Sequence, residues 1–121
     1  MCEWIGRPVK AKRSFLMYKI IRDDGASCYS PGGRASLGKY KTHGELLFYV
    51  LGKQVRSPSG PGIMGFKRLR TAQIVLRDMD RNTRIVQLRV PKDAIVREGE
   101  WKDRRCIMAS AVTPLKYARK K

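Results

Sequence analysis

Apolar and polar positions alternate most regularly in two segments of the chain. Residues 16–22 carry apolar side chains at alternate positions, and residues 83–90 do the same with Val86, Leu88 and Val90. Alternation with a period of two is typical of a β-strand that has one buried face. The pattern therefore predicts two strands, of which the second is a half-buried antiparallel strand.

Turn signals bound these two strands. Asp23-Asp24-Gly25 follows the first strand, and Pro91 follows the second. Glycine adopts the positive φ that tight turns require, and proline cannot donate a hydrogen bond within a sheet. Shorter apolar runs predict additional strands. A turn is predicted at 98–100, and residues 30–40 show no pattern of regular structure. These additional strands are residues 26–29, 45–51, 94–96 and 104–113.

One segment shows helical spacing. Over residues 66–79, Leu69, Ala72 and Met79 recur at intervals of three and seven, and basic side chains occupy the opposite face. One helix among several strands predicts an α+β fold, in which a small, mostly antiparallel sheet carries this helix on one face.

The length of 121 residues fits one domain. We expect a basic extension over residues 1–16, a single α+β domain over 17–115 and a basic tail over 116–121. The longest apolar run, 46–51, is too short to span a membrane. Three widely spaced cysteines are typical of free thiols in a reducing compartment, so we expect a cytoplasmic protein.

Charge adds the strongest functional signal. The chain has 27 basic and 10 acidic residues, for a net charge of +17. Residues 25–77 contain nine basic residues and only Glu45 as an acid, and residues 104–121 contain six basic residues and no acid. Residues 78–103 are neutral overall. Such an excess predicts a polyanionic partner, because self-repulsion otherwise destabilises the compact state.

A glycine-rich segment, residues 60–65, precedes the predicted helix and has the spacing G-x-G-x-x-G. Glycines allow backbone amides to approach a phosphate, and a helix N-terminus favours an anion. The chain is too short for a dinucleotide fold, and Val90-Pro91-Lys92 stands where an acidic ribose ligand belongs. The alternatives are a phosphate or backbone contact and a flexible loop.

Other chemistry has little support in the sequence. His43 is the single histidine and has no partner at a characteristic spacing, and no metal-binding motif is present. We therefore expect no enzyme activity, no metal and no cofactor.

From Met17 onward, the chain resembles small bacteriophage- and prophage-encoded proteins that have no agreed activity. The resemblance is carried by Tyr18 to Gly25, by Gly62 to Lys67 with Leu69 and Ala72, and by the strand Ile85 to Val90. It implies a compact α+β fold and a viral origin, and it assigns a role to no residue.

These observations favour a non-enzymatic protein that binds the backbone of a nucleic acid, DNA or RNA, with little base specificity. A phage inhibitor of a host defence complex, similar to an anti-CRISPR protein, and a small ribosomal or ribonucleoprotein component are the alternatives. The predicted phosphate-binding residues are Lys53, Arg56, Gly60, Gly62, Gly65, Lys67, Arg68, Arg70, Arg77, Arg104 and Arg105.

Overall fold

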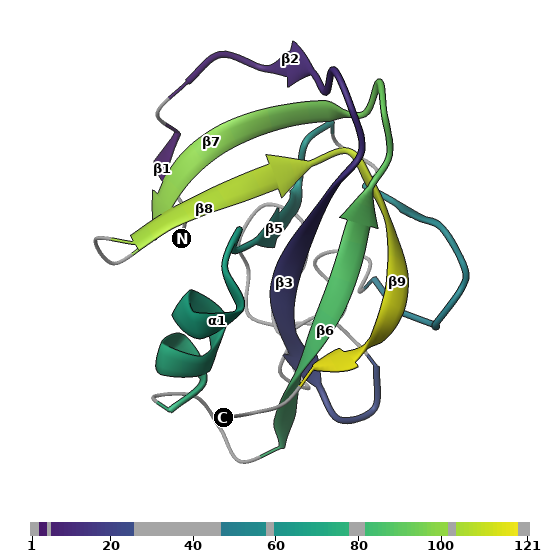
Figure 1. The fold of residues 1–121 in the computed structure, drawn as a ribbon, viewed down its shortest axis with the longest axis vertical. Coiled ribbons are helices and arrows are strands. Elements are labelled where there is room, and N and C mark those ends of the chain that lie inside the picture. Colours follow the sequence, from purple (N-terminus) through teal and green to yellow (C-terminus); the bar gives the residue numbers. More distant parts are fainter. Residues whose placement is uncertain are drawn as a thin grey trace, which may run out of the picture.

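The computed structural model describes residues 3–4, 6–25, 47–57, 60–77, 82–101 and 104–118. Antiparallel strands dominate these residues (Figure 1). In chain order the elements are β1 (Glu3–Trp4), β2 (Val9–Lys10), β3 (Phe15–Arg22), β4 (Val55–Arg56), β5 (Ile63–Gly65), α1 (Leu69–Leu76), β6 (Thr83–Val90), β7 (Ile95–Trp101), β8 (Arg104–Ala109) and β9 (Ala111–Ala118).

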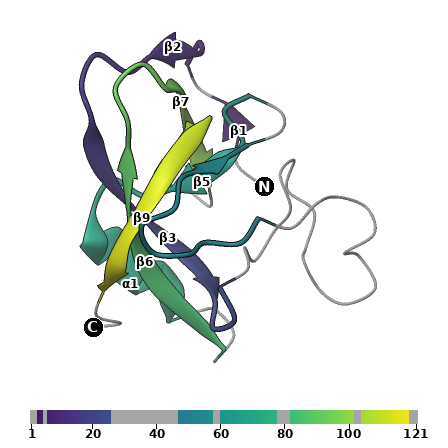
Figure 2. The same cartoon turned by 90° about the vertical axis from the view of Figure 1, so that its right-hand side faces the viewer.

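The first sheet has the strand order β3-β6-β9-β4. β3 and β6 pair along their whole length, with Phe15 opposite Val90 and Arg22 opposite Thr83. β9 pairs with the other edge of β6 through a register shift, and β4 adds the outer edge. Figure 2 shows β9 passing in front of β3 and β6. The predicted strands at 16–22 and 83–90 are therefore confirmed.

The second sheet has the order β1-β7-β8-β5, and β2 also pairs with β7. It lies across one end of the first sheet, as Figure 1 shows. The chain passes between the sheets at Ser110, whose amide donates to the Ile95 carbonyl at 2.8 Å. The Ser110 hydroxyl in turn accepts from the Ile95 amide at 2.9 Å. A β-bridge between Tyr18 and Phe66 joins the sheets at a second place.

Two apolar clusters hold the fold together. The larger lies between the sheets and is made of Met17, Ile21, Tyr49, Val55, Ile63, Val86, Leu88, Val90, Ala94, Ile107, Ala109 and Val112. The smaller forms where α1 packs against the outside of the sheets, and it is made of Ile20, Phe66, Ala72, Val75, Ile85 and Cys106. Because β3 contributes to both clusters, each of its faces carries buried residues.

Lys19 is a cation within this buried strand. Only 8% of its surface is exposed. Its Nζ donates to the Met64 carbonyl at 3.0 Å and lies 5.8 Å from the centre of the Tyr49 ring. A buried ammonium requires such partners, because desolvation without them is costly. Lys19 is therefore part of the core and does not contribute to the basic surface.

The expectation of an α+β fold with one helix packed on a single small sheet is wrong. Strands hold 54% of the described residues, and they form two sheets with one short helix. The helix begins at Leu69, three residues later than predicted, because Phe66 still forms a bridge to β3. α1 then fills the corner outside both sheets, where it covers residues from β3, β6 and β8.

Two further segments differ from the prediction, and the first of them belongs to the second sheet. The segment 98–100, which turn preference predicts as a turn, lies inside β7. Hydrogen bonding to β8 on one side and to β1 on the other overrides that local preference. The described part of 45–51 contains no strand, and of Phe48, Tyr49 and Val50 only Tyr49 is buried. The strand predicted at 26–29 and His43 lie outside the described residues.

Candidate nucleic-acid interface

α1 has one buried and one basic side. Ala72 and Val75 are buried against the sheets, whereas Arg70 and Arg77 are exposed. Arg70 and Arg77 are seven residues apart and therefore share one side of the helix. Arg68 is the N-cap but makes no side-chain capping hydrogen bond, and the first turn has no acidic residue. The positive end of the helix dipole thus lies beside further positive charge.

Glu98 of β7 connects the start of α1 to β8. Its two carboxylate oxygens lie 3.7 Å from Lys67 Nζ and 3.8 Å from Arg105 Nη1. All three side chains are more than half exposed, so each ion pair contributes little to stability. The two ion pairs nevertheless show that Lys67 and Arg105, which are far apart in the sequence, both lie next to the Glu98 carboxylate.

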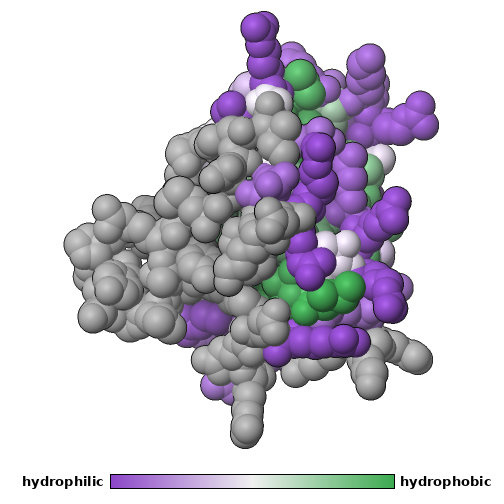
Figure 3. Space-filling model, turned by 90° about the vertical axis from the view of Figure 1, so that its left-hand side faces the viewer, coloured by the Kyte–Doolittle hydropathy of each residue, from purple (hydrophilic) through white to green (hydrophobic). Residues whose placement is uncertain are grey.

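The exposed and half-exposed cations of α1, its N-terminal flank and the start of β8 are together called the basic surface. Its members are Lys67, Arg68, Arg70, Arg77, Arg104 and Arg105. Arg104 lies on the face of β8 that carries Cys106, which packs in the cluster under α1, whereas Arg105 lies on the opposite face, with Ile107 and the Glu98 carboxylate. Among the residues that the structure describes, the nearby carboxylates are Glu98 and Glu100, the latter opposite Arg105 in the sheet. Figure 3 shows that hydrophilic residues predominate on this side of the described surface, with apolar residues in smaller patches.

Lys53 and Arg56 lie elsewhere. Arg56 belongs to β4, which pairs with β9 at the edge of the sheet farthest from β3. α1 packs on β3 and β6. At about 4.8 Å between neighbouring strands, the width from β3 to β4 is about 14 Å. Figure 1 shows the segment before β4 and the helix α1 on opposite sides of the sheet. The predicted binding residues therefore divide between two places.

The glycine-rich segment does not lead directly into the helix. Gly60 is exposed at a bend with a φ of +67°, and Gly62 donates its amide to the Gly60 carbonyl at 2.8 Å. Gly65 is buried in β5, where an added Cβ would lie 2.8 Å from the sulfur of Met17. Gly65 therefore allows close packing of the core, and its amide is not presented to a phosphate.

A pocket of about 600 Å³ opens beside the basic surface. Its walls are largely apolar, and basic side chains stand among them. The lining residues are Gly6, Arg7, Val9, Phe15, Leu16, Lys67, Val96, Arg97, Glu98 and Ile107. Arg97 Nε donates to the Gly6 carbonyl, which fixes the N-terminal segment against β7. The pocket can accept an apolar group that carries or adjoins a negative charge.

Most of the pocket was not predicted from the sequence. Of its lining residues, only Lys67 was among the predicted binding residues. Segment 6–16 meets β7 through the pairing of β2 with β7, with Val9 opposite Val96, and through the contacts of Gly6 with Arg97 and Glu98. A two-residue strand has too weak a pattern to predict that pairing. Val9 and Leu16 are apolar residues in the sequence, but only the structure shows that their side chains are exposed at the pocket.

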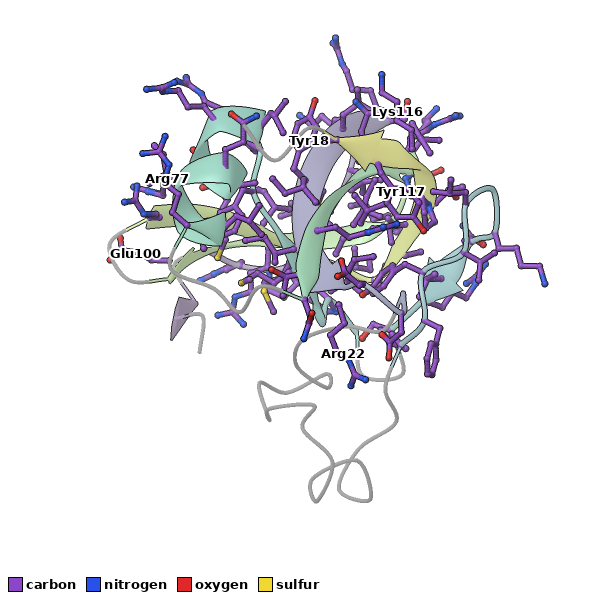
Figure 4. The ribbon with its side chains drawn as sticks, turned by 90° about the horizontal axis from the view of Figure 1, so that it is seen from below. Tyr18, Arg22, Arg77, Glu100, Lys116 and Tyr117 are labelled. Carbon is purple, nitrogen blue, oxygen red and sulfur yellow. The ribbon has the colours of Figure 1, made fainter. Side chains whose placement is uncertain are left out.

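A second cation group lies at the far end of β3 and β6. Arg22 pairs with Asp24 at 2.5 Å, and Arg84 lies 3.5 Å from Asp23. The Arg84 guanidinium also lies 4.2 Å from the centre of the Tyr117 ring. Figure 4 shows Arg77 at α1 and Tyr117 at β9, on opposite sides of Tyr18. Because carboxylates accompany Arg22 and Arg84, this end of the molecule is not a strong anion-binding site.

Cys106 corrects the prediction of three free thiols. It is buried in β8 and is disulfide-bonded. The other two cysteines, Cys2 and Cys28, lie outside the described residues. The cysteine spacing in the sequence gave no indication of this bond.

Within the described ranges, no group of three or more His, Cys, Asp or Glu side chains could hold a metal ion. No helix in this part of the chain is long and apolar enough to cross a membrane. Comparison of the chain with family models, with curated proteins and with the solved structures finds no match.

Proposed function

We propose that the protein is a non-enzymatic nucleic-acid-binding protein that contacts the phosphate backbone with its basic surface. The observation that carries the proposal is the concentration of six cations on α1, its N-terminal flank and the start of β8. Glu98 and Glu100 are the described carboxylates among them. Five of the six cations are arginines, and arginine binds phosphate oxygens in a bidentate manner.

The electrostatics support a polyanion over a small anion. Exposed charges interact over about 8 Å at physiological salt, so neighbouring cations on this surface repel one another. A single phosphate relieves the repulsion at one point, whereas a strand of phosphates relieves it along the whole surface and releases its own counterions. The uncapped N-terminal turn of α1 adds partial positive charge at the same place.

The proposal assigns no role to Lys53 and Arg56, which lie across the sheet. It also assigns no phosphate contact to Gly65, which is buried. Base-specific binding is not part of the proposal, because backbone contacts carry no sequence information by themselves.

Fluorescence anisotropy with a labelled 20-nucleotide single strand tests the proposal across a range of salt concentrations. For four to six phosphate contacts, we expect the logarithm of the affinity to fall against the logarithm of salt with a slope of about −3 to −4. That slope corresponds to a loss of affinity of about 100-fold between 50 and 200 mM salt. An affinity that stays constant over this range, or no binding at 50 mM, would contradict the proposal.

A further inference from the structure

The pocket beside the basic surface exposes apolar side chains. Val9 is 57% exposed and Leu16 is 43% exposed, and both line the pocket. Phe15 and Val96 continue the apolar wall inward, where they pack against the core between the sheets. Ile107, which is buried in that core, forms the deepest part of the wall. The pocket thus offers an apolar interior that is open to a ligand.

The pocket is lined by more cations than carboxylates. Arg7, Lys67 and Arg97 line it together with one carboxylate, Glu98. Lys67 belongs both to this lining and to the basic surface, and Glu98 connects it to Arg105. A polyanion that contacts Lys67 on the basic surface therefore lies beside the pocket.

We propose that the pocket binds one unstacked base of a single-stranded nucleic acid whose backbone lies on the basic surface. This inference rests on the proposed function and adds the class of nucleic acid to it. A base within a duplex is stacked and paired, so it cannot enter the pocket without being extruded. The protein therefore prefers single strands to duplexes of the same sequence.

The chemistry of the lining fits a base. A base has flat apolar faces and a polar edge. Phe15 supplies an aromatic side chain, which is a common stacking partner for unpaired bases. The Gly6 carbonyl already accepts from Arg97 Nε, and its second lone pair can accept a hydrogen bond from an amino group on the edge of a base. An acyl chain has no polar edge and would leave the cations of the lining, Arg7 and Lys67, without an anionic group from the same ligand. The volume of about 600 Å³ is ordinary for a small-ligand site.

An oligonucleotide with abasic positions isolates the contribution of the pocket. A 20-nucleotide strand in which every base is missing keeps its phosphates and has no base that could enter the pocket. Anisotropy at one salt concentration compares it with the unmodified strand. We expect the unmodified strand to bind about 5- to 100-fold more tightly, which is the effect of one stacked base. A duplex of the same sequence is measured alongside both strands.

A matched pair of variants assigns the difference to the pocket. Val9→Ala with Leu16→Ala removes apolar surface from the entrance. Val50→Ala with Leu51→Ala makes the same change at similar exposures, 53% and 41%, away from the pocket. Since all four side chains are exposed, both variants are expected to fold, and thermal unfolding checks this. The first variant reduces the preference for base-bearing strands toward one, and the second keeps the wild-type preference.

Each remaining outcome is decisive. Equal binding of unmodified and abasic strands, both salt-dependent, overturns the pocket assignment and leaves the proposed function in place. No binding of any strand at 50 mM salt overturns both. A duplex that binds as tightly as the single strand overturns the single-strand preference. Binding to vesicles of anionic phospholipid that is lost in the Val9→Ala, Leu16→Ala variant assigns the pocket to acyl chains instead.

Discussion

Gly65→Ala tests whether the last glycine of the glycine-rich segment is a packing position. An alanine Cβ would lie 2.8 Å from Sδ, 3.0 Å from Cε and 3.1 Å from Cγ of Met17. Favourable carbon contacts lie at about 3.5 to 4.0 Å, so the side chain of Met17 must shift. Met17 is fully buried between the sheets, and its neighbours limit that shift.

The magnitude follows from two opposing effects. Overpacking of a dense core costs about 1 to 3 kcal/mol. Replacing glycine by alanine in an unstrained backbone regains about 0.4 to 1 kcal/mol, because the unfolded chain loses freedom. We therefore expect Gly65→Ala to lower the free energy of unfolding by about 1 to 2 kcal/mol, with a fall in Tm of about 5 to 10 °C.

Denaturant and thermal unfolding followed by circular dichroism measure this change. Gly6→Ala is the matched control, since no atom lies within 4 Å of its added Cβ and its φ is not positive. The control is expected to be neutral or slightly stabilising. Adding Met17→Ala to Gly65→Ala should cost less than Met17→Ala costs in the wild type, because the new methyl group fills part of the cavity. A Gly65→Ala protein that is as stable as the wild type would refute the packing argument. If this variant also bound nucleic acid less tightly at unchanged stability, Gly65 would be a phosphate contact, as the sequence predicted.

Three further predictions concern charges and cysteines. Glu98→Gln removes the negative charge between Lys67 and Arg105, so the affinity for a single strand should rise about 2- to 5-fold in anisotropy titrations. A lower affinity would contradict the assignment of Lys67 and Arg105 to the nucleic-acid interface. Asp24→Asn should change the free energy of unfolding by less than about 1 kcal/mol in a denaturant titration, because its pair with Arg22 is exposed; a loss of several kcal/mol would show that the pair is structural. Thiol titration of the denatured protein without reductant should give one free thiol, since three cysteines are present and Cys106 is disulfide-bonded, whereas three thiols would contradict the structure.

The central strands were predictable because their pattern and their environment agree. β3 and β6 alternate with a period of two and end at a turn and at Pro91, as predicted, although both strands bury residues on a second face as well. Only the start of β7 was predicted, as a strand over 94–96, because Glu98-Gly99-Glu100 has turn preference and the pairing of this segment with β8 is a tertiary effect. Missing the rest of β7 also meant missing the second sheet, and with it the correct fold class.

The candidate site was predictable only in part. Helical spacing correctly placed Arg70 and Arg77 on one side of α1, because that relation depends on the helix alone. Arg56 was grouped with them by proximity in sequence, but the order β3-β6-β9-β4 puts its strand at the far edge. The pocket depends on the pairing of β2 with β7, about 85 residues apart, which local patterns do not encode.

A comparison of two variants with equal loss of charge tests the central claim most directly. Arg70→Gln with Arg77→Gln removes two cations from the basic surface, and Lys53→Gln with Arg56→Gln removes two from the other side of the sheet. Salt-dependent anisotropy with a single strand gives the slope for each. We expect the first variant to make the slope of log affinity against log salt shallower by about 1.4. The second variant should keep a slope near the wild-type value. Equal slopes for the two variants would show that net charge alone governs binding and would contradict a localised nucleic-acid interface.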